Sequence, residues 1–302
     1  MKKSILLIFI CFIFLQDCKS QESERISVII QPVIELGKTN SLKIVFQGIV
    51  DEQAIIISEA QGLQLNNNPS ISIRNINGED YTEYYTYIEA TEIGTLKLPE
   101  IKAVINGKTF TSPKNTIKVV AEITKISSDD IILKLNADKE NYNVKDTITV
   151  SLYEYSRFYS VQKKVNTNSS LNSVQHIKEN EGELKINLQS DLYKITGNKN
   201  LESYLETNFN MVSFDWDPFK TYAVMEEING KKYIKTLSFK ISLTAKVKGN
   251  YSISPSGFSY SIFKNESDIF KNSALNKGGK HTIINNSYKL NITSEELNFT
   301  VK

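Results

Sequence analysis

Hydrophobic and polar residues alternate along much of this chain, most regularly at residues 239–247. There, Phe239, Ile241 and Leu243 are separated by lysine and serine residues, so one face of the segment is apolar and the other is polar. This pattern is typical of an antiparallel strand with one buried side. Shorter runs of the same kind occur at residues 42–46, 71–73, 84–90, 96–98 and 117–119. The alternation predicts a chain made mainly of strands.

Turn signals separate these runs. Asn-Gly pairs occur at residues 77–78, 106–107 and 229–230, and both residue types accept the positive φ that tight hairpin turns require. Short strands joined by such turns predict an all-β chain organised as a β-sandwich.

One passage of the chain occurs twice. Residues 84–98 read YYTYIEATEIGTLKL and residues 239–253 read FKISLTAKVKGNYSI, and aligning Gly94 on Gly249 matches their apolar positions. A proline closes each passage, Pro99 in the first and Pro255 in the second, and each copy ends in a strand after a serine, at residues 112–120 and 294–302. We therefore expect two tandem sandwiches, at residues 21–121 and 122–302.

The second unit is expected to be the larger one. Its pattern weakens near residues 160–215 and again near 264–286, where Asn, Ser, Lys and Glu are frequent. These stretches read as inserted loops, with one or two helical turns at residues 201–206. Inserted loops on a rigid scaffold serve as binding surfaces or simply as surface loops, and the sequence leaves both interpretations open.

The N-terminus resembles a secretory signal peptide over residues 1–20. Lys2 and Lys3 precede an apolar run at residues 5–15, which is too short for a membrane-spanning helix of about 20 residues. Two routes of processing remain open: cleavage after Ser20, or lipidation of Cys18. In either case the exported chain has no cysteine pair, because Cys11 lies inside the signal, and hydrophobic cores must hold it together.

The charge balance excludes several classes of partner. The chain has 36 basic and 34 acidic residues; its first twenty contain three of the basic and one of the acidic ones, which leaves 33 of each. A neutral chain lacks the basic field that holds nucleic acid or anionic lipid. Membrane contact is therefore expected only through a lipid anchor or a partner.

The candidates for chemistry are few. His176 and His281 lie in polar stretches without regularly spaced ligands, and the acidic pairs at residues 129–130 and 215–217 lack a calcium-loop pattern. A nucleophile elbow and a glycine-rich phosphate loop are both missing from the sequence. We expect no cofactor, no metal and no enzymatic activity.

Aromatic residues are the better candidates for partner contacts, because a tyrosine ring is large and stiff and carries a hydroxyl. With Tyr84 facing inward like Phe239, the next tyrosines of that strand face outward. Trp216 is interpreted as a core residue or a plug between the domains. The candidate contact residues are Tyr85, Tyr87, Tyr155, Phe158 and Tyr159.

The order of several segments resembles the BatD-type oxygen-tolerance (aerotolerance) family. In the first unit these are SIRNING (72–78), YYTYI (84–88), GTLKLP (94–99) and NGKTFTS (106–112). In the second unit they are VKDTITVSLY (144–153), INGKKY (228–233) and residues 249–255. The resemblance covers most of residues 26–302 and depends on the order of the segments, since each one is an ordinary strand-and-turn sequence.

This resemblance implies exported Ig-like β-sandwich domains without a defined chemical activity. Family members are typically tied to the inner membrane by a later transmembrane helix. They are usually encoded beside von Willebrand A-domain proteins and a MoxR-type ATPase, and are linked to stress or oxygen tolerance. The chain ends at Lys302, directly after the second unit, so we expect a short form that lacks this helix.

The sequence thus predicts a non-catalytic protein of the periplasm or cell envelope that binds protein partners, by resemblance the von Willebrand A-domain proteins of a Bat-type operon. The alternative is a surface adhesin or glycan-binding β-sandwich protein.

Overall fold

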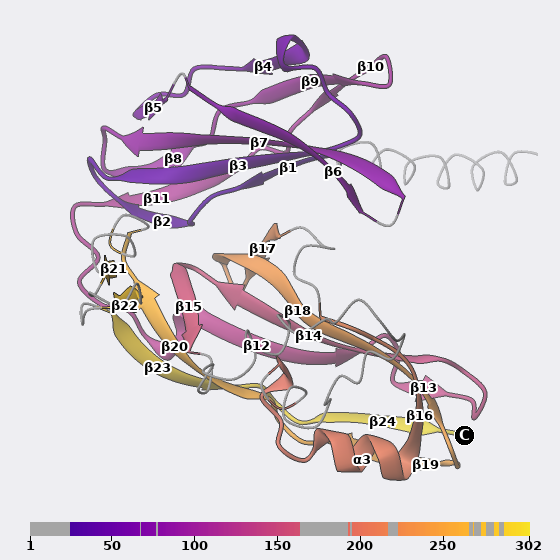
Figure 1. Cartoon of the computed structure of the whole chain (residues 1–302). Helices are drawn as coiled ribbons and strands as arrows, with labels where there is room; N and C mark the ends of the chain where they lie inside the picture. The colour runs from indigo at the N-terminus through magenta and orange to yellow at the C-terminus, as the bar shows by residue number, and fades with distance from the viewer. Residues whose placement is uncertain are drawn as a thin grey trace, which may run out of the picture.

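The computed structural model describes residues 25–66, 68–76, 78–163, 193, 195–216, 223–265, 268, 273–275, 281–283 and 287–302. Strands dominate these residues, and the all-β prediction of two tandem Ig-like sandwiches is confirmed (Figure 1). The described helices are α3 (Leu201–Asn208) and two short 3-10 turns, Glu52–Ala54 and Ser128–Asp130. No helix in the described part of the chain is both long and apolar enough to cross a membrane.

The N-terminal sandwich packs a five-stranded sheet against two three-stranded sheets. The five-stranded sheet contains β1 (Ile26–Ile29), β3 (Thr39–Gln47), β7 (Glu79–Ala90), β5 (Leu63–Leu65) and β6 (Ser70–Ile76). One smaller sheet contains β2 (Val33–Glu35), β11 (Thr116–Val120) and β8 (Gly94–Lys97). The other contains β10 (Lys108–Thr111), β9 (Ile101–Ile105) and β4 (Ile55–Ile57).

The C-terminal sandwich has the same arrangement. Its five-stranded sheet contains β12 (Ile131–Ala137), β14 (Ile148–Ser156), β18 (Lys231–Ala245), β16 (Phe209–Asp215) and β17 (Val224–Ile228). The smaller sheets contain β13 (Asn141–Tyr142), β24 (Leu297–Val301) and β19 (Gly249–Ile253), and β15 (Tyr159–Lys163), β20 (Gly257–Phe263) and β23 (Tyr288–Thr293). A separate pair is formed by β21 (Ser273–Leu275) and β22 (His281–Ile283).

The two sandwiches correspond strand by strand. The order β1-β3-β7-β5 matches β12-β14-β18-β16, and the order β2-β11-β8 matches β13-β24-β19, including the parallel first pair and the antiparallel second pair. In each unit a further strand, β6 or β17, pairs with the first half of the long central strand. The passage that occurs twice in the sequence is therefore the centre of a repeated topology.

The repeated serine has the same role in both copies. Ser112 donates its N–H to the oxygen of Ile101 (2.8 Å) and accepts the N–H of Ile101 on Oγ (3.0 Å). Ser294 makes both bonds with Ser256, at 2.8 and 3.0 Å. Aligning Gly94 on Gly249 places Ile101 opposite Ser256, so the sequence repeat holds at the level of individual hydrogen bonds.

Each repeated proline marks the point where the chain changes sheets. Pro99 lies between β8, which pairs with β11, and β9, which pairs with β4 and β10; Pro255 lies in the same way between β19 and β20. Proline has no N–H to donate to a ladder. Because the chain is changing pairing partners at this residue, the missing N–H does not cost a hydrogen bond.

Apolar residues from both layers fill two cores. The N-terminal core contains alternate residues of β3, β7, β9 and β11, and the C-terminal core contains the equivalent residues of β14, β18, β20 and β24. Ile88 and Ala90 are buried as predicted, and Tyr84 is half-buried against the N-terminal core. Val33 of β2 packs in the C-terminal core, which joins the sandwiches through side chains as well as through the linker.

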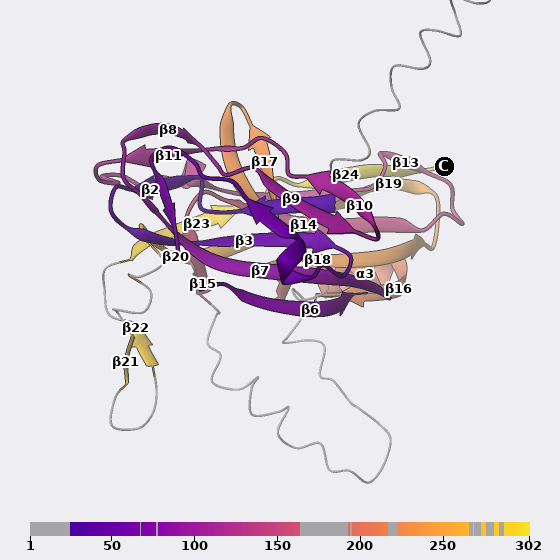
Figure 2. The ribbon, with the colours of Figure 1, turned by 90° about the horizontal axis from the view of Figure 1, so that it is seen from above.

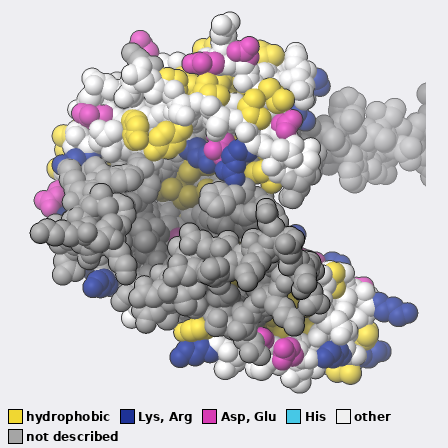
Figure 3. Space-filling model, viewed as in Figure 1, with side chains coloured by type: hydrophobic (Ala, Val, Ile, Leu, Met, Phe, Trp, Pro, Cys, Tyr) yellow, Lys and Arg dark blue, Asp and Glu magenta, His cyan; other side chains and the backbone are white. Residues whose placement is uncertain are grey.

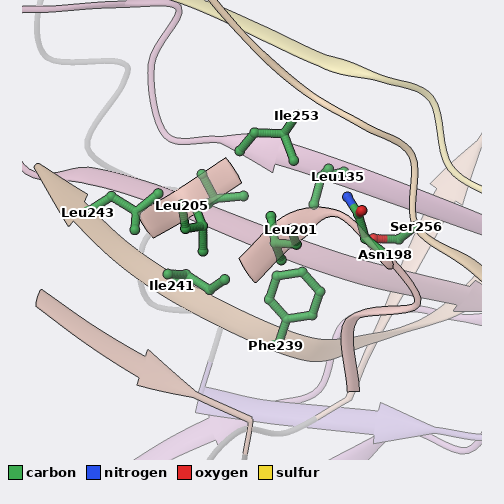
Figure 4. A pocket seen from close by; sticks show the side chains of 10 residues that line it. Leu135, Asn198, Leu201, Leu205, Phe239, Ile241, Leu243, Ile253 and Ser256 are labelled. Carbon is green, nitrogen blue, oxygen red and sulfur yellow. The ribbon is translucent and has the colours of Figure 1, made fainter. Parts of the chain in front are cut away.

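The region near residues 160–215, where the alternation is weak, contains a helix and a strand. The predicted helical turns are α3, whose Leu201 and Leu205 point toward Phe239 and Ile241 of β18 (Figure 4). The gap between them is part of the core and has no room for a water molecule. Strand β16, which follows α3, was not predicted because its register shifts between Met211 and Ser213 and so breaks the alternation.

Candidate functional site

Two equivalent hairpins differ most in their surroundings. The N-terminal hairpin is β6 with the first half of β7, and the C-terminal hairpin is β17 with the first half of β18. Gly78 has φ 87°, and Asn229 and Gly230 have φ 50° and 74°, which is the left-handed backbone that Asn and Gly adopt most easily in hairpin turns. Asn77 itself lies outside the described residues. Both hairpins are visible in Figure 1, the C-terminal one pointing at the N-terminal sandwich.

The C-terminal hairpin packs on the other sandwich. Strand β17 lies against β1, and Lys232, next to the turn, donates from Nζ to the side-chain oxygens of Asn115 (3.4 Å) and Thr116 (3.2 Å) and to the Thr116 carbonyl (3.3 Å). On the same side of β1 and β3, Ile29 and Val45 are buried although they are not part of the N-terminal core. The C-terminal hairpin thus packs on β1 at the border of the N-terminal sandwich.

Buried polar contacts extend this junction beyond the hairpin. Glu35 accepts the N–H of Ile123 (2.7 Å) and the side-chain amide of Asn265 (2.8 Å), and Gln31 donates to the Lys264 carbonyl (2.9 Å). Gln31, Glu35 and Asn265 are all buried. Buried polar groups without partners are costly, and such pairs therefore fix one relative position of the two sandwiches.

The N-terminal hairpin presents aromatic rings instead. Tyr85 and Tyr87 face outward as predicted, with ring centres 5.3 Å apart and planes at 85°, and Tyr87 is 40% exposed. Edge-to-face packing is a preferred geometry of aromatic pairs. Ile73 of β6 is also 55% exposed, but it pairs with the inward-facing Thr82 and therefore lies on the opposite face of the hairpin from the two rings.

An ion network lies beside these rings. Glu83 binds the Nζ of Lys43 and the guanidinium of Arg74, both at 2.9 Å, with only 14% of its side chain exposed. The C-terminal hairpin has one such pair at the equivalent positions with the charges exchanged: Lys235 binds Glu226 at 2.9 Å. Figure 3 shows basic and acidic side chains next to each other at the lower rim of the N-terminal sandwich, flanked by apolar side chains.

Strand β6 is an edge strand. Among the described strands it pairs with β7 alone, and most of its side chains are exposed or half-buried. In Figure 2 it forms the outer border of its sheet. An edge of this kind can accept a partner strand through main-chain hydrogen bonds.

The tip of the N-terminal hairpin is acidic. Glu79 accepts hydrogen bonds from Gln47 (3.0 Å) and Tyr81 (3.1 Å), and these two bonds, in that order, lower its pKa, with Arg25 adding a smaller effect. Asp80 accepts the amide of Asn75 at 2.7 Å. Both carboxylates are therefore held in place at the surface by hydrogen bonds.

Two predicted contact residues are not at the surface. Tyr155 is 2% and Phe158 is 5% exposed. Tyr155 does face outward, but Lys134 and Lys235 place their Nζ atoms 5.1 and 5.6 Å from its ring centre, and burial raises the pKa of its hydroxyl. Phe158 packs in the C-terminal core beyond the end of β14. The prediction that these two side chains are open to a partner is wrong, because alternation shows which way a residue points but not what covers it.

Other predicted residues are only partly placed. Tyr159 lies in β15, but its side chain is not described, and Cys18 and the whole signal segment lie outside the described residues. Trp216, interpreted as a core or inter-domain residue, is 55% exposed, and Met211 and Val212 nearby are exposed as well. That interpretation is wrong; the exposed edge at β16 was missed because Trp is so often buried.

The acidic pair at residues 129–130 has a structural role. Asp130 accepts the N–H of Ser127 (2.8 Å) and binds Arg157 (2.8 Å), and the Asp129 carbonyl accepts the hydroxyl of Tyr233 (2.9 Å). His176 and Asp217 lie outside the described residues, and the His281 side chain is not described. Within the described ranges, no group of three or more His, Cys, Asp or Glu residues is placed to hold a metal ion.

Comparison with solved structures gives distant likenesses. The Yersinia pseudotuberculosis adhesin InvE has 10% identity and a TM-score of 0.17, over 90% of this chain and 59% of InvE. The C-terminal domain of the Streptococcus agalactiae AgI/II polypeptide BspA has 8% identity and a TM-score of 0.19, over 91% and 99%. The C-terminal domain of the Streptococcus pyogenes antigen I/II-family protein AspA has 6% identity and a TM-score of 0.19, over 91% and 98%. Likeness at this level assigns neither fold nor function.

Family comparison is more informative. No curated protein matches the chain. Residues 27–119 match the BatD DUF11-like domain, which spans the N-terminal sandwich from β1 to β11 and includes Tyr85, Tyr87 and the N-terminal hairpin. The resemblance inferred from the order of the strand and turn segments is thereby confirmed for the N-terminal sandwich, which is a BatD-type domain.

Proposed function

We propose that this chain is a non-catalytic, exported module of the cell envelope that binds a protein partner through the N-terminal hairpin. One observation carries the proposal: an exposed edge strand, β6, lies beside an outward tyrosine pair and an ordered ion network on the domain that matches BatD.

The chemistry of this surface suits a protein partner. The tyrosine rings offer rigid contact area that costs little side-chain entropy to order. The unpaired edge of β6 offers main-chain donors and acceptors in register with a partner strand. Because Glu83 is already held by Lys43 and Arg74, binding does not have to order these side chains again, and part of the usual entropic cost is avoided.

The family supports the cellular setting. We infer export, a place in the periplasm or envelope, von Willebrand A-domain partners and a role in stress or oxygen tolerance, and the BatD match of the N-terminal sandwich supports this inference. Attachment to the membrane would come from lipidation of Cys18 or from the partner.

Crosslinking followed by affinity capture from envelope fractions tests this proposal. The full chain is compared with the double variant Tyr85→Ser/Tyr87→Ser, which removes both rings and leaves the strand positions polar. We expect the variant to capture at least about tenfold less of the partner protein than the native chain, since tyrosines buried in an interface are frequent hot spots.

The matched control is Ile56→Ser/Ile93→Ser, which removes similar exposed apolar area from β4 and from the β7–β8 turn. Equal capture by both variants, or capture of no envelope protein, would count against the proposal. Capture of glycans in place of protein would favour the adhesin alternative.

A further inference from the structure

We propose that an extended segment of the partner pairs with the open edge of β6 as an additional strand, with apolar residues beside Ile71 and Ile73 and a basic residue beside Asp80. This inference rests on the proposed function, and it names the mode of contact and the residue pattern of the segment that binds. It sets no condition on the fold of the partner, so the segment can belong to a von Willebrand A-domain protein.

The first step is the direction of the main-chain groups of β6. The hairpin turn has two residues, so Ile76 and Glu79 form the closing pair, which exchanges both main-chain hydrogen bonds in a hairpin of this type. From there, bonded and non-bonded pairs alternate along the antiparallel ladder. Asn75, Ile73 and Ile71 are the non-bonded positions. Their N–H and C=O groups therefore point away from β7, to the open edge.

A hydrogen bond outside the hairpin supports this assignment. The carbonyl of Tyr87 accepts the N–H of Asn66 at 2.9 Å, on the side of β7 where β5 and β6 lie. Tyr85 is the next alternate residue of β7, so its main-chain groups point to the same side, where it lies opposite Ser70. Ser70 is thus a bonded position, and its neighbour Ile71 is directed outward.

The second step is a comparison of β6 with two other edge strands. Strand β17, its equivalent in the C-terminal sandwich, lies against β1. Strand β16 has a register shift between Met211 and Ser213, and such a bulge disrupts the ladder that an added strand would follow. Strand β6 has seven residues and pairs with β7 along its whole length without a shift. This regular edge is as long as a typical strand.

The third step is the apolar area at the edge. Ile71 and Ile73 face the same side of the sheet as Thr82, which is the side of the N-terminal core. Over β7 this side is covered, because Thr82 accepts the N–H of Val50 and donates to the Gly48 carbonyl, both at 2.9 Å. The cover does not reach β6, since Ile73 is 55% exposed. Apolar side chains on an added strand would remove this area from water.

The outward side of β6 is small and polar instead. Ser70 and Ser72 are exposed and lie opposite Tyr85 and Glu83. These short side chains leave room for a longer side chain of the added strand to reach the ring of Tyr85 across β6. Successive side chains of a strand point to opposite faces, so one added strand contacts the isoleucines on one face and the tyrosine on the other.

The fourth step is the charge at the end of the edge. Asn75 donates its side-chain amide to the carboxylate of Asp80 at 2.7 Å, on the face that also carries Ile73. A Lys or Arg beside Asn75 would bring its charge to this carboxylate. The inward face of the added strand is therefore expected to carry two apolar residues and one basic residue at alternate positions.

A second copy of this chain fits the edge less well. Two β6 strands can pair antiparallel with Ile71 opposite Ile73, and Asn75 then lies opposite Pro69. Proline has no N–H for the ladder, and Pro69 offers no cation to Asp80. A segment of another protein can satisfy both groups, so it is the favoured occupant.

A proline at the edge tests the main-chain contacts in the full-length chain. Ile73→Pro removes an N–H that points to the edge and leaves the bonds between β6 and β7 in place. In the crosslinking and capture experiment described above, we expect this variant to capture about tenfold less of the partner protein. Ile73→Val keeps the N–H and a branched apolar side chain, and it should capture as much as the native chain. Circular dichroism checks that both variants are folded.

The charge requirement is tested by Asp80→Lys, which also keeps the inference testable if Ile73→Pro does not fold. We expect capture to fall by about tenfold, because the basic residue of the added strand would then meet a like charge. Glu59→Lys is the control, since Glu59 is exposed and lies off the hairpin while the change in net charge is the same.

Photo-crosslinking identifies the segment that binds. A benzoylphenylalanine residue replaces Ser72 in the full-length chain, and the crosslinked peptides are mapped by mass spectrometry after irradiation of living cells. We expect a peptide of the captured protein with apolar residues at alternate positions and a Lys or Arg two residues further along.

Three results would overturn the inference: capture that Ile73→Pro or Asp80→Lys leaves unchanged, crosslinked peptides that lack this pattern, or peptides from β6 of another copy. If Tyr85→Ser/Tyr87→Ser abolishes capture while Ile73→Pro and Asp80→Lys do not reduce it, the inference fails and the proposed function stands. If the native chain captures no envelope protein, both fall.

Discussion

The two hairpins of this protein have one topology and two environments. In each hairpin a short strand is joined by an Asn-Gly turn to the first half of the central strand. Each also carries a cross-strand ion pair, Arg74–Glu83 in one and Glu226–Lys235 in the other. One is seated on the neighbouring sandwich; the other keeps Ile73 and Tyr87 exposed.

This difference separates what the backbone repeats from what the side chains decide. Strand order and register survive the duplication because they depend on the inward apolar positions. Surface charge has changed sign at the tip and at the ion pair, and surface charge determines which neighbour a hairpin accepts.

The largest expected effect comes from introducing a charge at Val45, a buried residue on the outward face of β3. Val45→Asp should lower the free energy of unfolding by about 3–5 kcal/mol, because the carboxylate would be buried directly opposite the carboxylate of Glu83. Chemical denaturation measures the change. Ile73→Asp, at the exposed hairpin, is the matched substitution and should stay within about 0.5 kcal/mol of the native chain. Equal losses would mean that Val45 is no better shielded from water than Ile73.

A smaller effect is expected from Tyr260, a buried polar residue of the C-terminal core. It donates to Glu154 at 2.8 Å, and burial, together with the charge of Glu154, raises the pKa of its hydroxyl. The corresponding position in the N-terminal core is Ile105, which does not titrate. Tyr260→Phe should cost about 1.5 kcal/mol at neutral pH through the lost hydrogen bond to a charged group.

The sign of the pH effect follows from the raised pKa. The folded state keeps the phenolic proton more tightly than the unfolded state, so this stabilisation is complete below the unfolded pKa of about 10 and is lost as the pH rises above it. Hydrogen exchange at rising pH should therefore show the C-terminal sandwich opening first, and Tyr260→Phe should reduce that pH dependence. A first opening in the N-terminal sandwich would contradict the prediction.

The smallest effects concern the exchanged ion pairs. Double-mutant cycles should give a coupling of about 0.5–1 kcal/mol for Arg74–Glu83 and less for Glu226–Lys235. Glu83 is the least exposed of the four side chains and has two cationic partners, whereas Glu226 is 40% exposed. A larger coupling at Glu226–Lys235 would show that docking, and not exposure, sets the strength of these pairs.

Much of the fold was predictable from local pattern. The alternation at residues 84–90 and 239–245, the Asn-Gly turns and the two glycines that open β8 and β19 each appear in the structure as expected. Strand β16 was missed because the register shift after Met211 breaks the period of two.

The candidate site was predictable only in part. Tyr85 and Tyr87 lie on the outward face because their strand is regular and their neighbours are apolar. Tyr155 follows the same rule but is buried by two lysine side chains from neighbouring strands, and Phe158 lies past the end of its strand, where alternation no longer applies.

The sequence alone determined the strands, the turns and their duplication, because each depends on residues that are close together along the chain. Only the tertiary structure decided which outward faces are covered. Covering a face requires a surface from another part of the molecule, such as the Lys232 hairpin against β1, and no local pattern records a contact between residues more than a hundred positions apart.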